Sequence, residues 1–98
     1  MNRISEKLIQ FFNNDATKWT QGTSARSKSG DAVPATDSRA ICWCLTGALL
    51  KLEVEGELNN NDLLSYTAMW KDRYYSYPFL TNDRMSSFEE LEQHIKGI

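Results

Sequence analysis

Two cysteines and one histidine are the residues of this chain that could support covalent chemistry. Cys44 lies in the uncharged stretch 43–49, which mixes small and large residues as buried helices do. A thiol near a helix start, with a base close in space, can act as a nucleophile in a hydrolase or transferase. His94 would have to be that base, oriented by Asn82 or Asp83. We favour the simpler interpretation, a buried structural cysteine, because free cysteines are among the most buried residues.

The same residues do not predict a disulfide, a metal site or a cofactor. On a helix, Cys42 and Cys44 would lie about 200° apart, on nearly opposite faces, and could not be bridged. They lack the spacing of zinc ligands, and His94 is far along the chain. No glycine-rich phosphate-binding motif is present. Reduced thiols are typical of a cytoplasmic protein.

Residues 18–39 form a locally basic segment that could bind an anion. Its charged side chains are Lys18, Arg26, Lys28, Asp31, Asp37 and Arg39. With the hydroxyl side chains between them, Arg26 and Arg39 could hold a nucleotide or another small anion. The alternative is a structural role, in which Arg26 forms a salt bridge or spans a hairpin.

The segment from Trp70 to Phe79 interleaves aromatic side chains with two cations. Helical spacing assigns Trp70 and Tyr74 to the core, which leaves Tyr75, Tyr77 and Phe79. If they are exposed, such a cluster marks a contact site. We favour a protein partner or self-association over nucleic acid, because neighbouring acidic residues offset the basic charge. Burial of all three rings is the open alternative.

Four helices are expected to position these residues, over about 3–13, 37–53, 60–75 and from Ser86 to the end. Each has apolar residues at helical spacing. Ser86 and Glu89 fit a capping box at the start of the last helix, and Pro78 is expected to close the third. The apolar positions are Ile4, Leu8, Phe11 and Phe12; Ile41, Leu45, Leu49 and Leu52; Leu63, Tyr66, Trp70 and Tyr74; and Phe88, Leu91, Ile95 and Ile98.

Within the second predicted helix, two positions matter for function and packing. Cys44 would lie in its second turn, where the helix dipole has little effect on a thiol. Gly47 costs about 1 kcal/mol relative to alanine inside a helix, so we expect it to allow close packing against Trp19 or the first helix.

Between the first and second helices, the turn signal at residues 28–31 predicts a short β-hairpin or an ordered loop. Its flanks are residues 19–26 and 32–33, and Pro34 ends any pairing. The fold class is therefore mainly α, or α+β, in one domain over residues 1–98.

With these motifs in place, the chain resembles a family of small bacterial and phage proteins of unknown function. The shared pattern is a Trp-x-x-Gly-x-x-Ala-Arg block, a glycine turn, a Trp-Cys-x-x-Gly-Ala-Leu segment and a late Asn-Asp before the last helix. The matching residues are Trp19, Gly22, Ala25 and Arg26; Gly30; Trp43, Cys44, Gly47, Ala48 and Leu49; and Asn82 and Asp83. The resemblance implies a shared fold and a phage or mobile-element origin, but no activity and no catalytic residues.

Composition and charge reduce the range of expected partners and functions. The net charge of −2 favours neither nucleic acid nor an anionic membrane as a partner. No apolar run approaches the ~18 residues of a membrane span, and the first residues do not form a signal peptide. We therefore expect a cytoplasmic, non-enzymatic interaction or regulatory domain. Its expected binding surface comprises Trp19, Arg26, Arg39, Tyr75, Tyr77 and Phe79.

Overall fold

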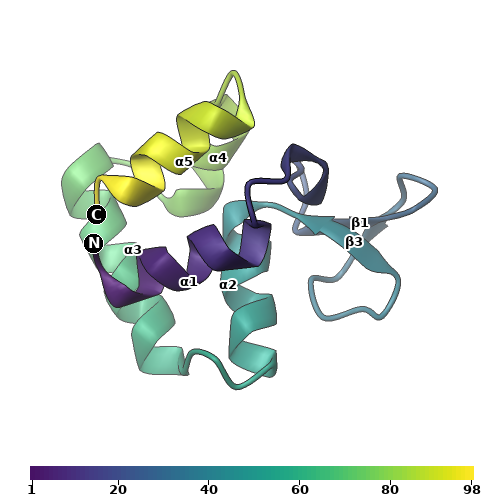
Figure 1. The fold of residues 1–98 in the computed structure, drawn as a ribbon, viewed down its shortest axis with the longest axis horizontal. Coiled ribbons are helices and arrows are strands. Elements are labelled where there is room, and N and C mark those ends of the chain that lie inside the picture. The colour runs from purple at the N-terminus through teal and green to yellow at the C-terminus, as the bar shows by residue number, and fades with distance from the viewer.

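The computed structural model describes all residues from 1 to 98, and it shows a mixed α+β fold. A small antiparallel sheet lies at one end of the molecule, and both chain termini lie at the opposite end (Figure 1). The elements in chain order are α1 (Arg3–Phe12), the 3-10 turn η1 (Ala16–Lys18), β1 (Ala25–Ser27), β2 (Ala32–Val33), β3 (Ala40–Trp43), α2 (Leu45–Val54), α3 (Asn60–Tyr74), α4 (Pro78–Arg84) and α5 (Phe88–Lys96).

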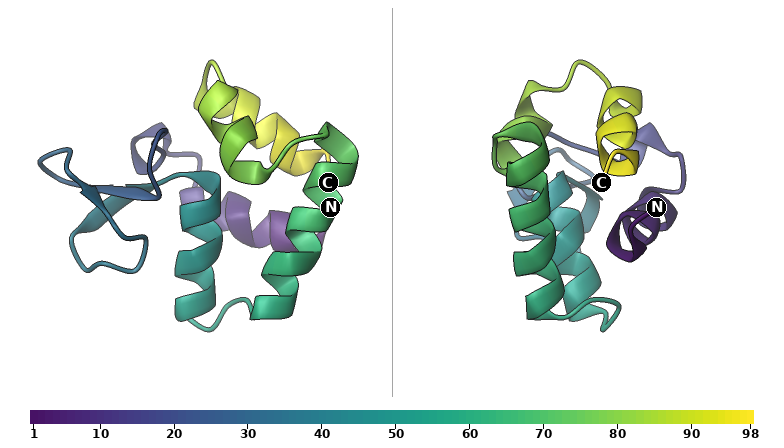
Figure 2. Two further views of the ribbon diagram at one scale, coloured as in Figure 1. Left: turned by 180° about the vertical axis from the view of Figure 1, so that it is seen from behind. Right: turned by 90° about the vertical axis from the view of Figure 1, so that its left-hand side faces the viewer.

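The helices form two layers. Figure 2 shows α2 and α3 running in opposite directions, joined by a short loop, while α1 and α5 lie together on one side of this pair. The core between them is built from the apolar stripes that the sequence predicts: Leu8, Tyr66, Trp70, Leu91 and Ile95 are all fully buried. No helix combines the length and the apolar character needed to cross a membrane.

The first helix forms as its sequence predicts. The side chain of Asn2 accepts hydrogen bonds from the backbone N–H groups of Ile4 and Ser5, which is a standard N-cap. Asn13 ends the helix in the left-handed conformation, with φ of 50°, which asparagine tolerates better than most residues.

The predicted helix over 37–53 is wrong in its first part. Residues Ala40–Trp43 form strand β3, which pairs with β1, and the helix begins only at Leu45. A short apolar run fits a strand and a buried helix equally well, so the available backbone partner decides. Ile41 falls at the irregularity in the β1–β3 register and is 50% exposed, so it is absent from the predicted core stripe.

The predicted hairpin is present and is part of a larger sheet. Strand β1 pairs with β2 on one side and with β3 on the other, both antiparallel, in the order β2-β1-β3. Gly30 takes a φ of +89° in the turn between β1 and β2, a conformation that favours glycine.

The C-terminal third contains one helix that the sequence does not predict, so the fold has five helices and not four. Helix α3 ends at Tyr74, and Pro78 starts the additional helix α4 instead of closing the helix before it. Proline suits a first helical position because its missing N–H would have no partner there. The last helix is capped by Ser87, one residue later than predicted, and Glu90 accepts a hydrogen bond from the backbone of Ser86.

Candidate pocket and aromatic face

A pocket of about 220 Å³ lies where the loop before β1, the start of α2 and helix α4 meet. These segments are far apart in the sequence, so the pocket exists only in the folded chain. Its lining residues are Gly22, Thr23, Ser24, Cys44, Thr46, Phe79 and Asp83.

Asn82 holds the three walls of this pocket together. Its side chain is fully buried, and its Oδ1 accepts hydrogen bonds from the indole Nε1–H of Trp19 (2.7 Å) and the backbone N–H of Leu45 (3.1 Å). Its Nδ2 donates to the carbonyl oxygen of Thr20 (3.1 Å). One amide side chain therefore connects the loop, α2 and α4.

Asp83 lies at the rim of the pocket and is held by the backbone of the opposite wall. Its Oδ1 accepts hydrogen bonds from the N–H of Gly22 (2.9 Å) and from Nδ2 of Asn82 (3.2 Å). The ion pairs of the molecule involve Asp62, Glu57 and Asp37, so Asp83 has no cationic partner. It is the one charged residue in the pocket lining.

Gly47 allows α2 to lie directly against the loop. A Cβ atom at this position would overlap the backbone carbonyl oxygen of Ser24. The prediction of close packing at Gly47 is therefore confirmed, although its neighbour is the backbone of Ser24 and not Trp19 or α1. In the same contact, the N–H of Cys44 donates to the Ser24 oxygen (3.1 Å).

Cys44 is the N-cap of α2, not a second-turn residue. Its thiol accepts a hydrogen bond from the backbone N–H of Gly47 (3.2 Å), and the residue is only 5% exposed. Burial raises the pKa of this thiol above its ordinary value, and the nearby carboxylate of Asp83 raises it further, against the lowering effect of the helix amides. The thiol is therefore protonated at neutral pH. Cys42 is also free and lies in β3, so no disulfide joins the two.

His94 lies elsewhere, on α5. Its Nδ1 is 2.9 Å from the carbonyl oxygen of Glu90, and its ring packs beside those of Tyr74 and Trp70. None of its contacts includes Cys44 or Asp83, so the structure does not assemble a cysteine–histidine pair. No group of His, Cys, Asp and Glu side chains is arranged to hold a metal ion.

Arg26 and Trp19 form hydrogen bonds that hold the loop before β1 in its conformation. The guanidinium of Arg26 donates to Thr20 Oγ1 (3.0 Å) and to the carbonyl oxygens of Gln21 (3.1 Å) and Gly30 (3.2 Å). This arrangement matches the structural alternative, in which Arg26 spans the hairpin. Trp19 donates to Asn82 and its ring packs near that of Phe88.

Arg39 is separate from Arg26 and is paired. Its Nη2 lies 3.0 Å from a carboxylate oxygen of Asp37, and hydrogen bonds from Arg39 lower the pKa of that carboxyl. It borders a shallow depression with Ser27, Lys28, Ser29 and Asp31. The two arginines therefore do not form a joint anion site.

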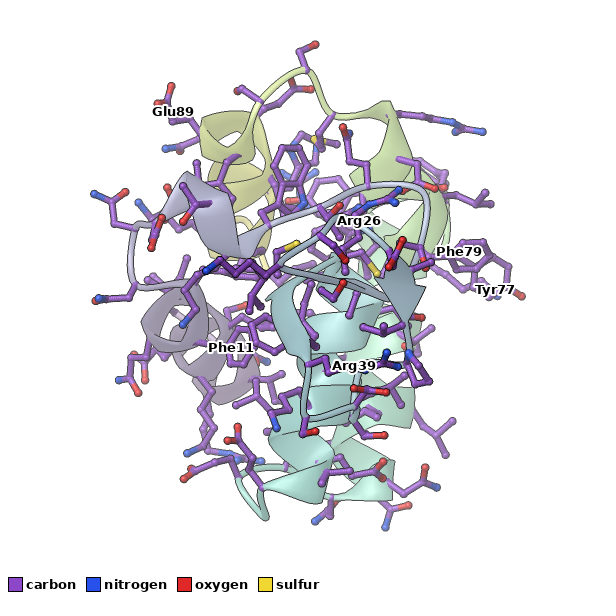
Figure 3. All side chains as sticks on the ribbon, turned by 90° about the vertical axis from the view of Figure 1, so that its right-hand side faces the viewer. Phe11, Arg26, Arg39, Tyr77, Phe79 and Glu89 are labelled. Atoms are coloured by element: carbon purple, nitrogen blue, oxygen red, sulfur yellow. The ribbon has the colours of Figure 1, made fainter.

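The surplus aromatic side chains are exposed, which answers the question left open by the sequence. Tyr75 is 91% exposed, Tyr77 46% and Phe79 48%. The rings of Tyr77 and Phe79 are stacked, with centroids 5.9 Å apart, and they project from the same edge of the molecule (Figure 3). Leu80 is the next exposed residue on α4. We call Tyr75, Tyr77, Phe79 and Leu80 the aromatic face.

The aromatic face adjoins the pocket, because Phe79 belongs to both. The sequence predicted that the 19–26 block and the aromatic segment form one surface, and residues 22–24 do line the pocket with Phe79. The sequence singled out Ser24 only as one of the hydroxyl side chains that could help Arg26 to hold an anion, and no local signal marks Thr23 or Thr46 as lining residues. The sequence singled out Asp83 as a possible partner of His94 and as part of the late Asn-Asp element, but not as a pocket residue.

Comparison of the chain with protein-family models, with curated proteins and with solved structures found no match. The resemblance to a family of small bacterial and phage proteins therefore stays a prediction.

Proposed function

We propose that this protein is a small non-enzymatic interaction domain that binds a protein partner through its aromatic face. The observation that supports this proposal is the stacked pair of Tyr77 and Phe79, each about half exposed. All other aromatic side chains except Tyr75 are packed in or against the core. Clustered exposed aromatic rings are characteristic of contact sites, where such rings supply large contact areas.

Contacts within the protein restrict the backbone at Pro78 and the Tyr77 ring before any partner binds. Pro78 stands between Tyr77 and Phe79 at the start of α4, which restricts the backbone there. The ammonium group of Lys71 lies 4.3 Å from the centroid of the Tyr77 ring and 3.2 Å from its hydroxyl oxygen. A surface whose side chains are already ordered loses less conformational entropy on binding.

The geometry favours this function over the two alternatives. A catalytic Cys44 would need a lowered thiol pKa and a nearby base, whereas burial raises its pKa and His94 lies on another element. An anion site would need free cationic groups, whereas the donors of Arg26 are directed at loop oxygens and Arg39 is paired with Asp37.

The test is a double variant, Tyr77→Ala/Phe79→Ala, with Val54→Ala/Leu64→Ala as control. Val54 and Leu64 are each 62% exposed and lie outside the aromatic face. The partner is first purified on the parent protein from the cell that produces it, and its affinity for all three proteins is then measured. We expect the aromatic variant to lose about 2 kcal/mol or more of binding free energy, as hot-spot residues do, and the control to bind like the parent.

Stability must be measured alongside, by urea unfolding. Both variants should unfold within about 1 kcal/mol of the parent, since none of the altered side chains belongs to the core. Equal partner affinity of the parent and the aromatic variant would refute the proposed surface. Sedimentation of the free protein distinguishes a second copy of this chain from a different partner.

A further inference from the structure

We infer that the pocket beside Phe79 receives an arginine side chain of the partner protein. The inference rests on the proposed function and adds the chemistry of the partner. It starts from the charge of the pocket. Asp83 is its single charged lining residue, has no cationic partner, and keeps its Oδ2 free of hydrogen bonds within the protein. A carboxylate presented in this way is complemented by a cation.

The start of α2 does not turn this pocket into an anion site. The backbone N–H of Leu45 is bonded to Asn82, and that of Gly47 is bonded to the thiol of Cys44. The Asp83 carboxylate already supplies negative charge at this end of the helix. A bound anion would therefore face a like charge and find the N–H groups of Leu45 and Gly47 occupied.

Neutral acceptors surround the carboxylate. Thr23, Ser24 and Thr46 also line the pocket, and each carries a hydroxyl group that can accept a hydrogen bond. Together with Asp83 Oδ2 they offer several oxygen acceptors to one incoming group. A guanidinium carries five N–H donors in a plane, whereas an ammonium carries three on a single nitrogen, so this acceptor set suits arginine better than lysine.

An aromatic wall completes the site. Phe79 lines the pocket, so a planar cation entering beside Asp83 would meet this aromatic side chain. The pocket has a volume of about 220 Å³. A guanidinium has four heavy atoms, which need roughly 120 Å³ if each takes the space of a water molecule. The group therefore fits the pocket.

The test is an NMR titration of the ¹⁵N-labelled protein with N-acetyl-arginine methylamide. The matched probe is the citrulline analogue, which has the same shape but no charge, and the lysine analogue tests the guanidinium geometry. We expect saturable shifts at residues 22–24, 44–46 and 79–83 with arginine, and binding about tenfold weaker for Asp83→Asn. The Asp83→Asn side chain keeps an oxygen that can accept the Gly22 N–H, and Asp72→Asn on the exposed surface of α3 serves as control.

The outcomes separate the pocket from the proposed function. Shifts for arginine that citrulline does not produce, reduced in Asp83→Asn but not in Asp72→Asn, support the inference. Equal binding of citrulline, equal or tighter binding of lysine, or an unaffected Asp83→Asn variant overturns it. If partner binding depends on Tyr77 and Phe79 but not on Asp83, the pocket inference fails alone. If arginine binds and partner affinity does not depend on the two rings, the aromatic-face proposal fails alone.

Discussion

At the scale of single residues, Gly47 shows how one missing side chain determines where α2 lies. Glycine costs about 1 kcal/mol relative to alanine inside a helix, yet here it lets the helix meet the backbone of Ser24. The hydrogen bond from the Cys44 N–H to the Ser24 oxygen depends on the same approach. The pocket, which both Ser24 and Cys44 line, is therefore a consequence of this contact.

We predict that Gly47→Ala destabilises the fold by about 2–3 kcal/mol, because the added methyl group meets rigid backbone. The control is Ser65→Ala, which changes an exposed position of helix α3. The control should cost less than about 1 kcal/mol. Urea unfolding followed by circular dichroism measures both, and equal stability of the two variants would contradict the assigned role of Gly47.

At the scale of elements, a buried polar junction ties α1, α3 and α5 together. The Ser5 hydroxyl of α1 donates to the carbonyl oxygen of Ile95 in α5 (2.9 Å) and lies 2.8 Å from the Tyr66 hydroxyl of α3. Ser5 and Tyr66 are both fully buried. Buried polar groups that are fully paired specify one arrangement of the helices, since any other leaves them without partners.

This junction predicts a loss of stability at alkaline pH. Burial raises the pKa of Tyr66 from 10.0 to about 12, so between these values the unfolded chain releases a proton that the folded chain keeps. The titration of Tyr66 therefore leaves the free energy of unfolding unchanged below about pH 10. As the pH rises from 10 towards 12, this free energy falls by up to about 1.4 kcal/mol per pH unit.

The comparison that isolates this effect is parent against Tyr66→Phe, with urea unfolding measured from pH 8 to 11.5. Cys44 and Tyr74, whose pKa values are also raised by burial, titrate in both proteins and cancel. Tyr66→Phe should show a shallower alkaline decline, while Tyr75→Phe, at a 91% exposed position, should follow the parent. Identical slopes for all three proteins would rule out the proposed effect of Tyr66.

At the scale of the whole molecule, Asn82 joins parts of the chain that no single element connects. Through it, the loop at Trp19 and Thr20, the start of α2 and helix α4 share one buried amide. Gln21 adds two hydrogen bonds from the same loop, to the carbonyl oxygens of Asn82 and Met85 (both 2.9 Å). The sheet end and the helical body are held together in this region.

We predict that Asn82→Ala lowers the free energy of unfolding by about 3 kcal/mol or more, because it leaves the buried N–H of Leu45 and the partly buried polar groups of Trp19 and Thr20 without this partner. Asn61→Ala, on the exposed surface of α3, should stay within about 0.5 kcal/mol of the parent. Urea unfolding gives both values. An Asn82→Ala protein as stable as the Asn61→Ala control would show that Asn82 does not connect these segments.

The local parts of this protein could be predicted from its amino-acid sequence. Helical spacing predicted α1, α3 and α5 and their buried faces, the turn at Gly30 predicted the β1–β2 hairpin, and Gly47 predicted a close contact. These features follow from residues close together in the chain, whose propensities and periodicity can be counted directly.

The remaining features depend on contacts between segments that are distant in the chain. Residues 40–43 became a strand because β1 offered a backbone to pair with, and Cys44 became an N-cap as a result. Tyr77 and Phe79 remained exposed because the core was filled by other rings, and Asp83 met the 22–24 loop through contacts about sixty residues apart. Such pairings depend on which distant segments meet, a choice made by the total burial and hydrogen bonding of the fold and not by local propensity.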